Sequence, residues 1–573
     1  MLHVVLLFGW LLSGGAEYVN FGEVMSLSAV VVGPGGEVVS SQRVGESDHP
    51  LAWNAGSPSV FVLDSERVAI KTQVCGVWAR SVKLSLFVLE ADGSRTAVRE
   101  HLDNSYSLGA STPVVPSFDF ERDRTYVVEA VAYAESDAEG AEVASLEARL
   151  SVFRKWPSAK VTPDDPQFND RFGNAVAISG DLLVAGSYNE DAGGNIGFDS
   201  GSVYVFRKRN NRWTQVAKLT ADDSSEDNGF GVSVALSGST VVVGALLNDI
   251  AGKNNAGKRA GSAYVFTSDD DGDSWTQVTK LVPDDTARYD EFGVYSLAIS
   301  NNIIVVGAPG DDETGTDVGS AYVYKRDDGG QSWLLVRKLR PADAVYGDGK
   351  GGDTFGQSVA VVAENNQYVI VVGAPGGGDG AAYVFDSDDR GQSWRQVAKF
   401  TPSDAVRRSF FGRAVAVSSG HAIAVGSPNA DSGEEVYGGA AYVYQKQAGT
   451  NKWVEAARLT AGDATEWDEF GLAVDISGDR VVVGAWYDGD GGFHSGSAYV
   501  FQRHGATWPL AAKLTAPDGA PTDRFGWAVA IDGTSVVAGC QDDDDVTNSA
   551  YYFDFTGYYQ TGSNSGAAYV FSL

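Results

Sequence analysis

Short apolar runs separated by turns rich in Gly, Asp and Ser follow one another from about residue 156 to the end of the chain. In one stretch, apolar and polar positions alternate over Val232–Leu236, and Val241–Ala245 is apolar throughout. Two further runs follow at Ser262–Phe266 and Trp275–Leu281. Alternation predicts a half-buried strand, and a short uninterrupted apolar run predicts a strand covered on both faces. The stretch therefore predicts four strands.

This four-strand unit occurs seven times. A Phe-Gly pair opens each copy, with successive spacings of 58, 62, 63, 56, 59 and 55 residues. The phenylalanines are Phe172, Phe230, Phe292, Phe355, Phe411, Phe470 and Phe525. A repeat of this length, made of strands alone, predicts a radial array of small four-stranded sheets.

The last copy is one strand short. Between Phe525 and Phe571 only three strands are expected, and a matching fourth strand lies upstream of the first copy at residues 156–162. We expect this segment to pair with the last copy and close the ring, which removes the unpaired sheet edges that favour aggregation.

The units RFGNAVAISGDLLVAGS…GSVYVF and EFGLAVDISGDRVVVGAW…GSAYVF resemble the FG-GAP repeat of integrin-alpha-type propellers. The likeness covers about residues 155–573. It implies an all-β fold with a seven-bladed β-propeller over 154–573. Because this fold hosts many roles, the resemblance does not by itself assign a function.

One feature of the family is missing. Its members often carry a calcium loop of Asp-x-Asp-x-Asp-Gly type between the first and second strands, whereas this chain has short turns such as Ser179-Gly180-Asp181. Calcium takes six to eight oxygen ligands, which these turns cannot supply. The family's calcium sites therefore do not transfer; no cofactor is assigned with certainty, and calcium binding elsewhere in the chain stays open. The remaining metal candidates are Asp311, Asp312 and Asp317, with a solvated charge run as the alternative.

A second recurring pattern resembles the Asp box of sialidases. It runs from Ser268 to Trp275 and from Ser387 to Trp394, between the third and fourth strands. Asp and Gly at these positions predict a locked hairpin. The sequence shows no arginine cluster or Tyr–Glu pair of the kind a sialidase site requires.

The longer loops are expected to share one face of the ring. Antiparallel strands place the second-to-third loops and the links between repeats on the same side, and loops on a rigid scaffold commonly carry binding residues. The ligand-binding candidates there are Trp467, Trp486, Tyr487, Asp488, Asp490 and Phe493. Packing among the loops themselves is the alternative.

Two rows of Asp recur on this face. One follows the fourth strand, and the other lies two residues before the Phe. We expect both to cap turns through backbone hydrogen bonds, with cation binding as the alternative. The rows are Asp165, Asp223, Asp285, Asp343, Asp404, Asp463 and Asp518, then Asp170, Asp290, Asp353, Asp468 and Asp523.

The first part of the chain lacks the repeat. An apolar run at Val4–Leu12, followed by the small residues Gly14 and Ala16, predicts a signal peptide over 1–16. Strand-like runs over 17–153 predict a β-sandwich of immunoglobulin or fibronectin type. No later segment is long and apolar enough to span a bilayer.

Charge and composition narrow the function. The charges sum to 43 − 75 = −32, which disfavours nucleic acid as a partner. Two cysteines cannot form a disulfide framework, and Cys540 takes a slot that other repeats fill with Ala or Ser. We expect a non-catalytic recognition or adhesion protein, secreted or at the cell surface, that binds an extracellular protein or glycan. The alternatives are a secreted carbohydrate-active enzyme using the same loop face and a purely structural module.

Overall fold

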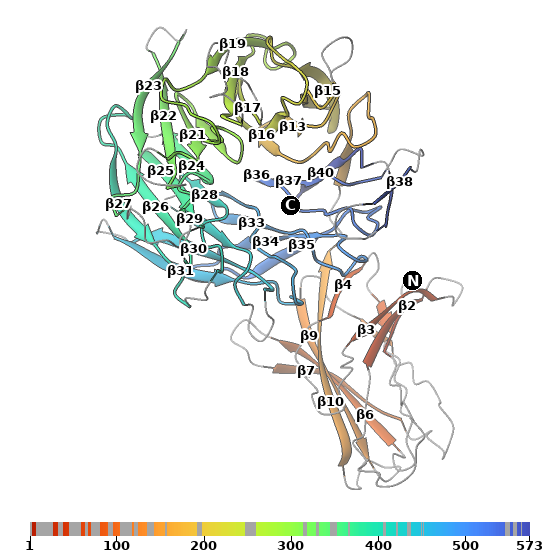
Figure 1. Ribbon diagram of the computed structural model, residues 1–573. Coiled ribbons are helices and arrows are strands. Elements are labelled where there is room, and N and C mark those ends of the chain that lie inside the picture. The colour runs from red at the N-terminus through yellow and green to blue at the C-terminus, as the bar shows by residue number, and fades with distance from the viewer. Residues whose placement is uncertain are drawn as a thin grey trace, which may run out of the picture. The chain divides into compact units, whose positions relative to one another are not determined.

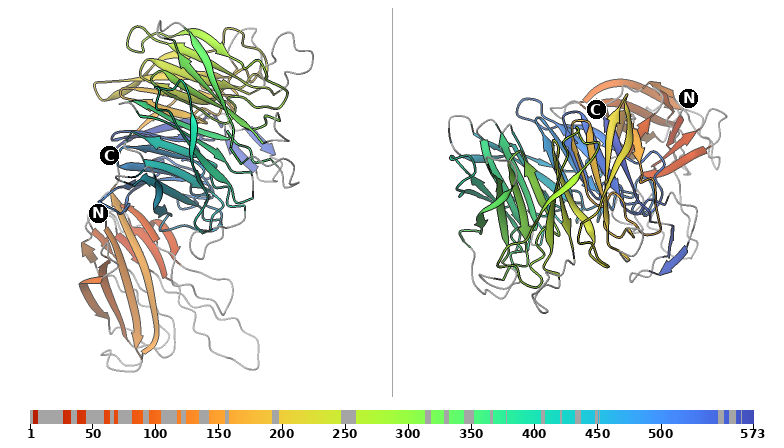
Figure 2. Two further views of the ribbon diagram at one scale, coloured as in Figure 1. Left: turned by 90° about the vertical axis from the view of Figure 1, so that its left-hand side faces the viewer. Right: turned by 90° about the horizontal axis from the view of Figure 1, so that it is seen from above.

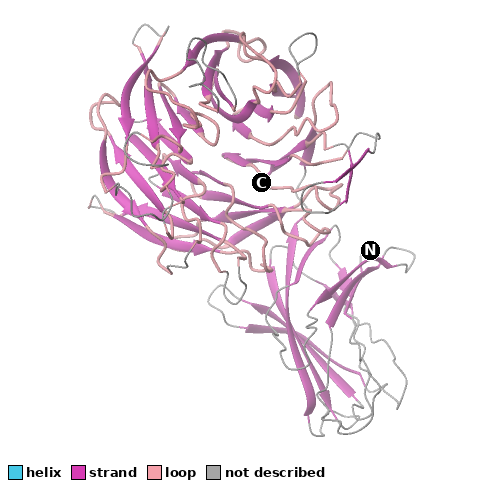
Figure 3. Cartoon of the chain, viewed as in Figure 1, coloured by secondary structure: helices cyan, strands magenta, loops and turns pink. Residues whose placement is uncertain are grey.

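The computed structural model describes the chain in two parts. Up to residue 157, the described residues are those of ten strands. From Ser158 onward all residues are described except 192–197, 247–258, 313–317, 328–331, 344–351, 365–366, 377, 405–407, 420–421, 432–436, 448–449, 451, 545–549, 554–558 and 563. The chain divides into two compact units, Met1–Lys155 and Trp156–Leu573. The strands of both are shown in Figure 3, and none of the described residues is helical.

The first unit contains three sheets. β1–β2–β3 form one, β4–β10–β9–β6–β7 form a second, and β5 pairs with β8. Within the second sheet β4 and β10 run parallel and the other pairs antiparallel. The strands are β1 (His3–Leu6), β2 (Leu27–Val32), β3 (Val38–Val44), β4 (Ser59–Leu63), β5 (Arg67–Ala69), β6 (Ser81–Leu89), β7 (Arg95–Asp103), β8 (Ser117–Asp119), β9 (Arg124–Tyr133) and β10 (Glu142–Arg154). The signal peptide and the β-sandwich stay predictions.

The second unit is a seven-bladed propeller of four-stranded antiparallel sheets (Figure 1). Blade 1 consists of β12 (Val176–Ser179), β13 (Leu182–Ser187), β14 (Ser202–Arg209) and β15 (Arg212–Leu219). Blade 2 consists of β16 (Phe230–Ser237), β17 (Thr240–Ala245), β18 (Ser262–Thr267) and β19 (Thr276–Leu281). Blade 3 consists of β20 (Leu297–Ser300), β21 (Ile303–Ala308), β22 (Ser320–Arg326) and β23 (Trp333–Leu339). The sequence predicted this architecture, and the structure confirms it.

Blades 4 to 6 repeat the pattern. They are β24 (Ser358–Glu364), β25 (Gln367–Ala374), β26 (Ala381–Asp386) and β27 (Arg395–Phe400); β28 (Val415–Ser418), β29 (Ala422–Ser427), β30 (Ala440–Lys446) and β31 (Trp453–Leu459); and β32 (Val474–Ser477), β33 (Arg480–Ala485), β34 (Ser497–Gln502) and β35 (Leu510–Leu514). The turned views in Figure 2 show the sheets of adjacent blades lying one against the next. Apolar residues from neighbouring blades share each core cluster, so the core is a ring of layers between sheets.

Blade 7 combines both ends of the propeller. Its strands are β36 (Val529–Asp532), β37 (Ser535–Cys540), β40 (Ala567–Ser572) and β11 (Ser158–Val161), with the hairpin β38 (Ala550–Phe553)–β39 (Tyr559–Gly562) inserted before β40. β11 pairs antiparallel with β40, with Lys160 opposite Tyr569. The segment near Lys160 therefore supplies the strand that the last repeat lacks, as the sequence suggested.

The Phe-Gly pair joins adjacent blades. Phe172 is fully buried, with its ring 5.7 Å from that of Tyr204 in an edge-on contact, and its backbone bridges to Gly566 of blade 7. Gly173 has φ +86°, and a Cβ there would lie 2.3 Å from the carbonyl oxygen of Ala567. Glycine is required at position 173 because its backbone is left-handed and lies too close to the backbone of Ala567 for a side chain to fit between them.

The Asp-box pattern locks the hairpins that precede β19 and β27. The carboxylate of Asp270 accepts hydrogen bonds from the hydroxyl and backbone N–H of Ser274 and from the hydroxyl of Ser268. These bonds lower the pKa of Asp270 to about 2. Asp389 holds the equivalent hairpin in the same way. The predicted structural role is confirmed for both. No helix able to cross a membrane occurs among the described residues.

Candidate functional site

A carboxylate, a tyrosine and a cation meet at the outer part of each blade. In blade 1 the Tyr204 hydroxyl donates to Oδ1 of Asp165 at 2.8 Å, and Lys218 Nζ lies 2.7 Å from Oδ2. The ammonium also lies 5.2 Å from the Tyr204 ring centroid. Asp165 follows β11 of blade 7, so the trio ties one blade to the next. We call these trios interblade locks.

The other six blades carry the same three positions. The locks are Asp223, Tyr264 and Lys280; Asp285, Tyr322 and Lys338; Asp343, Tyr383 and Lys399; Asp404, Tyr442 and Arg458; Asp463, Tyr499 and Lys513; and Asp518, Tyr569 and Lys160. The side chains of the first Asp row, which were expected to cap turns, bridge adjacent blades. In the second row, Oδ2 of Asp170, Asp290, Asp468 and Asp523 accepts a backbone N–H three residues upstream, as predicted.

A second carboxylate strengthens four locks. In blade 3, Oδ2 of Asp311 accepts from the Tyr322 hydroxyl at 2.9 Å and lies 2.5 Å from Lys338 Nζ. Asp488 and Asp543 act likewise in blades 6 and 7, and in blade 1 Glu190 pairs with Lys218 alone of the lock. The metal candidate Asp311 is therefore buried against an ammonium of the same chain. Asp312 is exposed, and Asp317 lies outside the described residues.

Blade 6 holds the densest of these groups. Oδ2 atoms of Asp463, Asp488 and Asp490 lie 2.7, 2.8 and 2.5 Å from Lys513 Nζ. Burial opposes the charge on Lys513, but the three carboxylates raise its pKa well above the ordinary value. The three Asp are close enough to ligate a metal ion, yet a buried ammonium occupies the position between them. Asp488 and Asp490 are thus engaged inside the fold.

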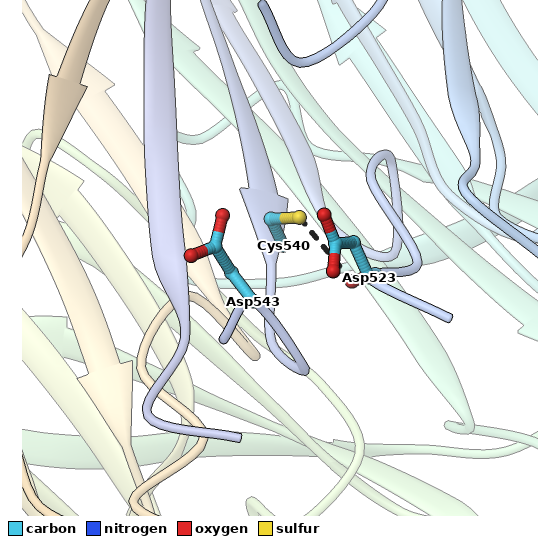
Figure 4. A group of neighbouring side chains, drawn as sticks. All are labelled: Asp523, Cys540 and Asp543. Atoms are coloured by element: carbon cyan, nitrogen blue, oxygen red, sulfur yellow. Dashed lines mark hydrogen bonds between the residues drawn. The ribbon is translucent and has the colours of Figure 1, made fainter. Parts of the chain in front are cut away.

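A similar group in blade 7 contains the buried cysteine (Figure 4). Asp523, Cys540 and Asp543 bring their ligand atoms close together. The Cys540 thiol donates to the carbonyl of Asp523 at 3.2 Å, just as the hydroxyl of Ser187 donates to the carbonyl of Asp170 at 2.8 Å. Burial raises the thiol pKa well above its ordinary value, which disfavours the thiolate that metals bind. Lys160 already pairs with Asp543. The cysteine fits the small buried slot that the sequence predicted.

A cavity of about 590 Å³ opens along the axis of the ring. All seven blades line it with the residue two places after the motif Phe: Asn174, Val232, Val294, Gln357, Arg413, Leu472 and Trp527. Six of these residues precede the first strand of their blade and Val232 lies near the start of β16, while Tyr188 and Trp486 follow second strands. The cavity therefore opens at the face that carries the long loops, and we call it the channel mouth.

Arginines and aromatic rings line the channel mouth. Arg524 Nη1 lies 2.9 Å from Oδ2 of Asp542, and Arg171 Nη1 lies 3.8 Å from its Oδ1. The Arg524 guanidinium lies 5.1 Å from the Trp486 ring centroid, and Trp527 meets Trp486 edge-on at 4.7 Å. Tyr188 and Tyr295 complete the aromatic lining. No Asp or Glu is among the described residues that line the cavity.

The predicted aromatic ligand residues fall into two groups. Trp486 lines the channel mouth, with Tyr487 at 3.6 Å between ring centroids. His494 lies 4.1 Å from the Tyr487 ring and 3.6 Å from the Phe493 ring, and Phe493 is 49% exposed. Trp467 is 52% exposed and lies 4.5 Å from the Tyr437 ring. Their role in ligand binding stays a prediction.

Sequence reasoning missed the arginines. Arg171, Arg413 and Arg524 come from blades 1, 5 and 7, and they line one cavity only because the ring closes. A signal was present: within an otherwise regular motif, the position two residues after the Phe varies in chemistry from copy to copy. In a closed ring that position lines the axis.

Comparison with curated proteins finds integrin alpha chains. The chain is 27% identical over 282 residues to integrin alpha-3 of Cricetulus griseus, covering 44% of this chain and 25% of that protein. It is 28% identical over 233 residues to integrin alpha-7 of Rattus norvegicus, covering 37% and 19%. The chain therefore matches only about a quarter or less of the length of these relatives.

Solved structures show weaker likeness. Saccharomyces cerevisiae Sqt1 has a TM-score of 0.38 and 11% identity, covering 72% of this chain and 98% of that one. Polysaccharide lyase Uly1 has a TM-score of 0.43 and 10% identity, covering 73% and 99%. Likeness at this level says nothing about the activity of this chain.

The FG-GAP repeat model matches seven segments, 157–206, 213–266, 275–324, 333–385, 394–444, 453–501 and 508–571. Each segment begins in the fourth strand of one blade and ends in the third strand of the next, so the sequence unit straddles two blades just as the interblade locks do. With seven matched repeats and seven blades, the chain belongs to the FG-GAP repeat family and is an integrin-alpha-like β-propeller.

Proposed function

We propose that this chain is a non-catalytic recognition module that acts outside the cell, secreted or at the cell surface, and presents the loop face of its propeller to a protein or glycan. The observation that carries the proposal is the channel mouth, a cavity of about 590 Å³ with aromatic and cationic walls at the centre of the loop face. Ligand sites commonly combine such a largely apolar hollow with a few polar groups. The integrin alpha relatives support a role in adhesion or recognition.

The competing function is a carbohydrate-active enzyme using the same face. Glycoside hydrolysis commonly needs two carboxyl groups facing one another across the substrate. None of the described lining residues carries a carboxyl group. Tyr295 could serve as a nucleophile beside Glu291, but burial raises the Tyr295 pKa and the Glu291 charge adds to that shift. An activated phenol requires a lowered pKa. These features favour binding.

The test is a binding screen on immobilised extracellular proteins and glycans. Trp486→Ala and Trp527→Ala should abolish the binding seen for the unaltered chain, because both rings lie at the channel mouth. Leu334→Ala, an exposed position on β23, is the matched control and should bind normally. Equal binding by all variants, or turnover of a glycan by the unaltered chain, would contradict the proposal.

A further inference from the structure

The charge of the channel mouth is opposite to that of the whole chain. Formal net charge is −32, yet the ionisable side chains lining the cavity are Arg171, Arg413 and Arg524, with tyrosines as the other titratable groups. The guanidinium group of arginine stays protonated and positively charged at any pH at which a protein remains folded. The positive lining is therefore a local feature that the bulk composition conceals.

Arg413 has no partner within the described fold. Its guanidinium makes no hydrogen bond or ion pair with a described residue, while burial lowers its pKa and Tyr295 and Glu469 act on it only at longer range. Nε of Arg524 is also buried without an acceptor among the described residues. Arg413 is only partly buried, so its guanidinium can be reached from the cavity, whereas the buried Nε of Arg524 is costly without an acceptor. An acceptor from outside the chain would bond to both arginines.

Carboxylates lie close to the cavity on several sides. Asp542 faces Arg171 and Arg524, and Glu469 accepts the Trp486 indole N–H at 2.8 Å. The charge of Glu291 acts on Tyr295, and that of Asp199 acts on Tyr188. Because these carboxylates repel a second negative charge, the cavity suits a singly charged anion better than a doubly charged phosphate.

We propose that the channel mouth binds a small organic carboxylate of about monosaccharide size, with Arg413 and Arg524 holding the carboxylate against the aromatic wall. The inference rests on the proposed function, since it names a ligand for the same cavity. Guanidinium groups present paired N–H donors that fit the two oxygens of a carboxylate. The rings of Tyr188, Tyr295 and Trp527 offer an apolar surface to the body of the ligand.

The test titrates the full chain with sodium glucuronate, N-acetylalanine, glucose and inorganic phosphate, following heat and tryptophan fluorescence. We expect a carboxylate to bind at least tenfold more tightly than glucose or phosphate; the two acids distinguish a sugar source from a peptide-like source. Arg413→Met should weaken that binding at least tenfold, the loss expected for one hydrogen bond to a charged group. Arg395→Met removes an exposed charge on β27 and should bind normally.

Three results would overturn the proposal. They are no binding of either acid at millimolar concentration, equal binding of glucuronate and glucose, and tighter binding of phosphate. The comparison of ligands uses the unaltered chain, so it decides the matter even if Arg413→Met fails to fold. Carboxylate binding without retention on any immobilised protein or glycan would leave this inference standing and contradict the proposed function. Retention on an immobilised protein or glycan without binding of either free acid would contradict this inference and leave the proposed function standing.

Discussion

The interblade locks and the channel mouth are built from the same types of side chain but differ in how fully their cations are paired. Both place a cation beside an aromatic ring and a carboxylate. In a lock such as that of blade 6, Lys513 meets three carboxylates and is almost fully buried. At the channel mouth, Arg171 and Arg524 share one Asp, and Arg413 has no described partner. A saturated cation stabilises the fold, whereas an unsaturated one leaves hydrogen-bonding capacity for a ligand.

The largest effect should come from a saturated lock. Lys513→Met leaves the buried Asp463 and Asp488, with the partly exposed Asp490 beside them, without their cation, and breaking a buried pair costs about 3–5 kcal/mol. Chemical denaturation should show this loss in the free energy of unfolding. Lys399→Met is the matched control, since Lys399 is 38% exposed and Asp343 is its one carboxylate partner among the described residues. Equal losses in the two variants would mean that burial and carboxylate number do not set the strength of a lock.

The second-row aspartates should make stability fall as pH rises. Burial raises the pKa of Asp523 to about 7 from 3.8. The folded state then holds a proton that the unfolded state releases, so stability is full below pH 3.8 and is lost as pH rises to about 7. Asp523→Asn keeps an acceptor for the Ala520 N–H and should remove on the order of 4 kcal/mol of this dependence. Parallel pH profiles of unfolding for wild type and variant would contradict this.

The fold was open to prediction because its signals are local and repeated. Phe172 and Gly173 recur with their neighbours in every copy, so the blade, its strand count and the closing strand could be derived from spacing alone. The candidate site could not be predicted in this way, because Arg171, Arg413 and Arg524 lie in different repeats. Only ring closure brings them together. Asp488 and Asp490 look like loop acids in sequence, and only the structure shows that they face Lys513.

Removing an unsaturated cation should barely affect stability. Arg413→Met takes away a partly buried charge that has no described partner, so we expect the free energy of unfolding to change by less than about 1 kcal/mol or to rise. Denaturation of this variant beside Lys513→Met measures the contrast directly. A loss as large as that of Lys513→Met would show that Arg413 is a structural cation and would remove the distinction between the two regions.

The smallest effect should come from calcium. The buried carboxylates that lie nearest one another already hold Lys513 in blade 6 and Lys160 in blade 7, so a divalent ion would have to displace an ammonium that is paired with two or three carboxylates. We expect the same Tm with calcium and with a chelator. Lys513→Met is the informative companion, because it leaves three Asp with ligand atoms close together and no internal cation. Calcium should raise the Tm of that variant alone. A higher Tm of the unaltered chain in calcium would mean that carboxylates outside the interblade locks bind the ion.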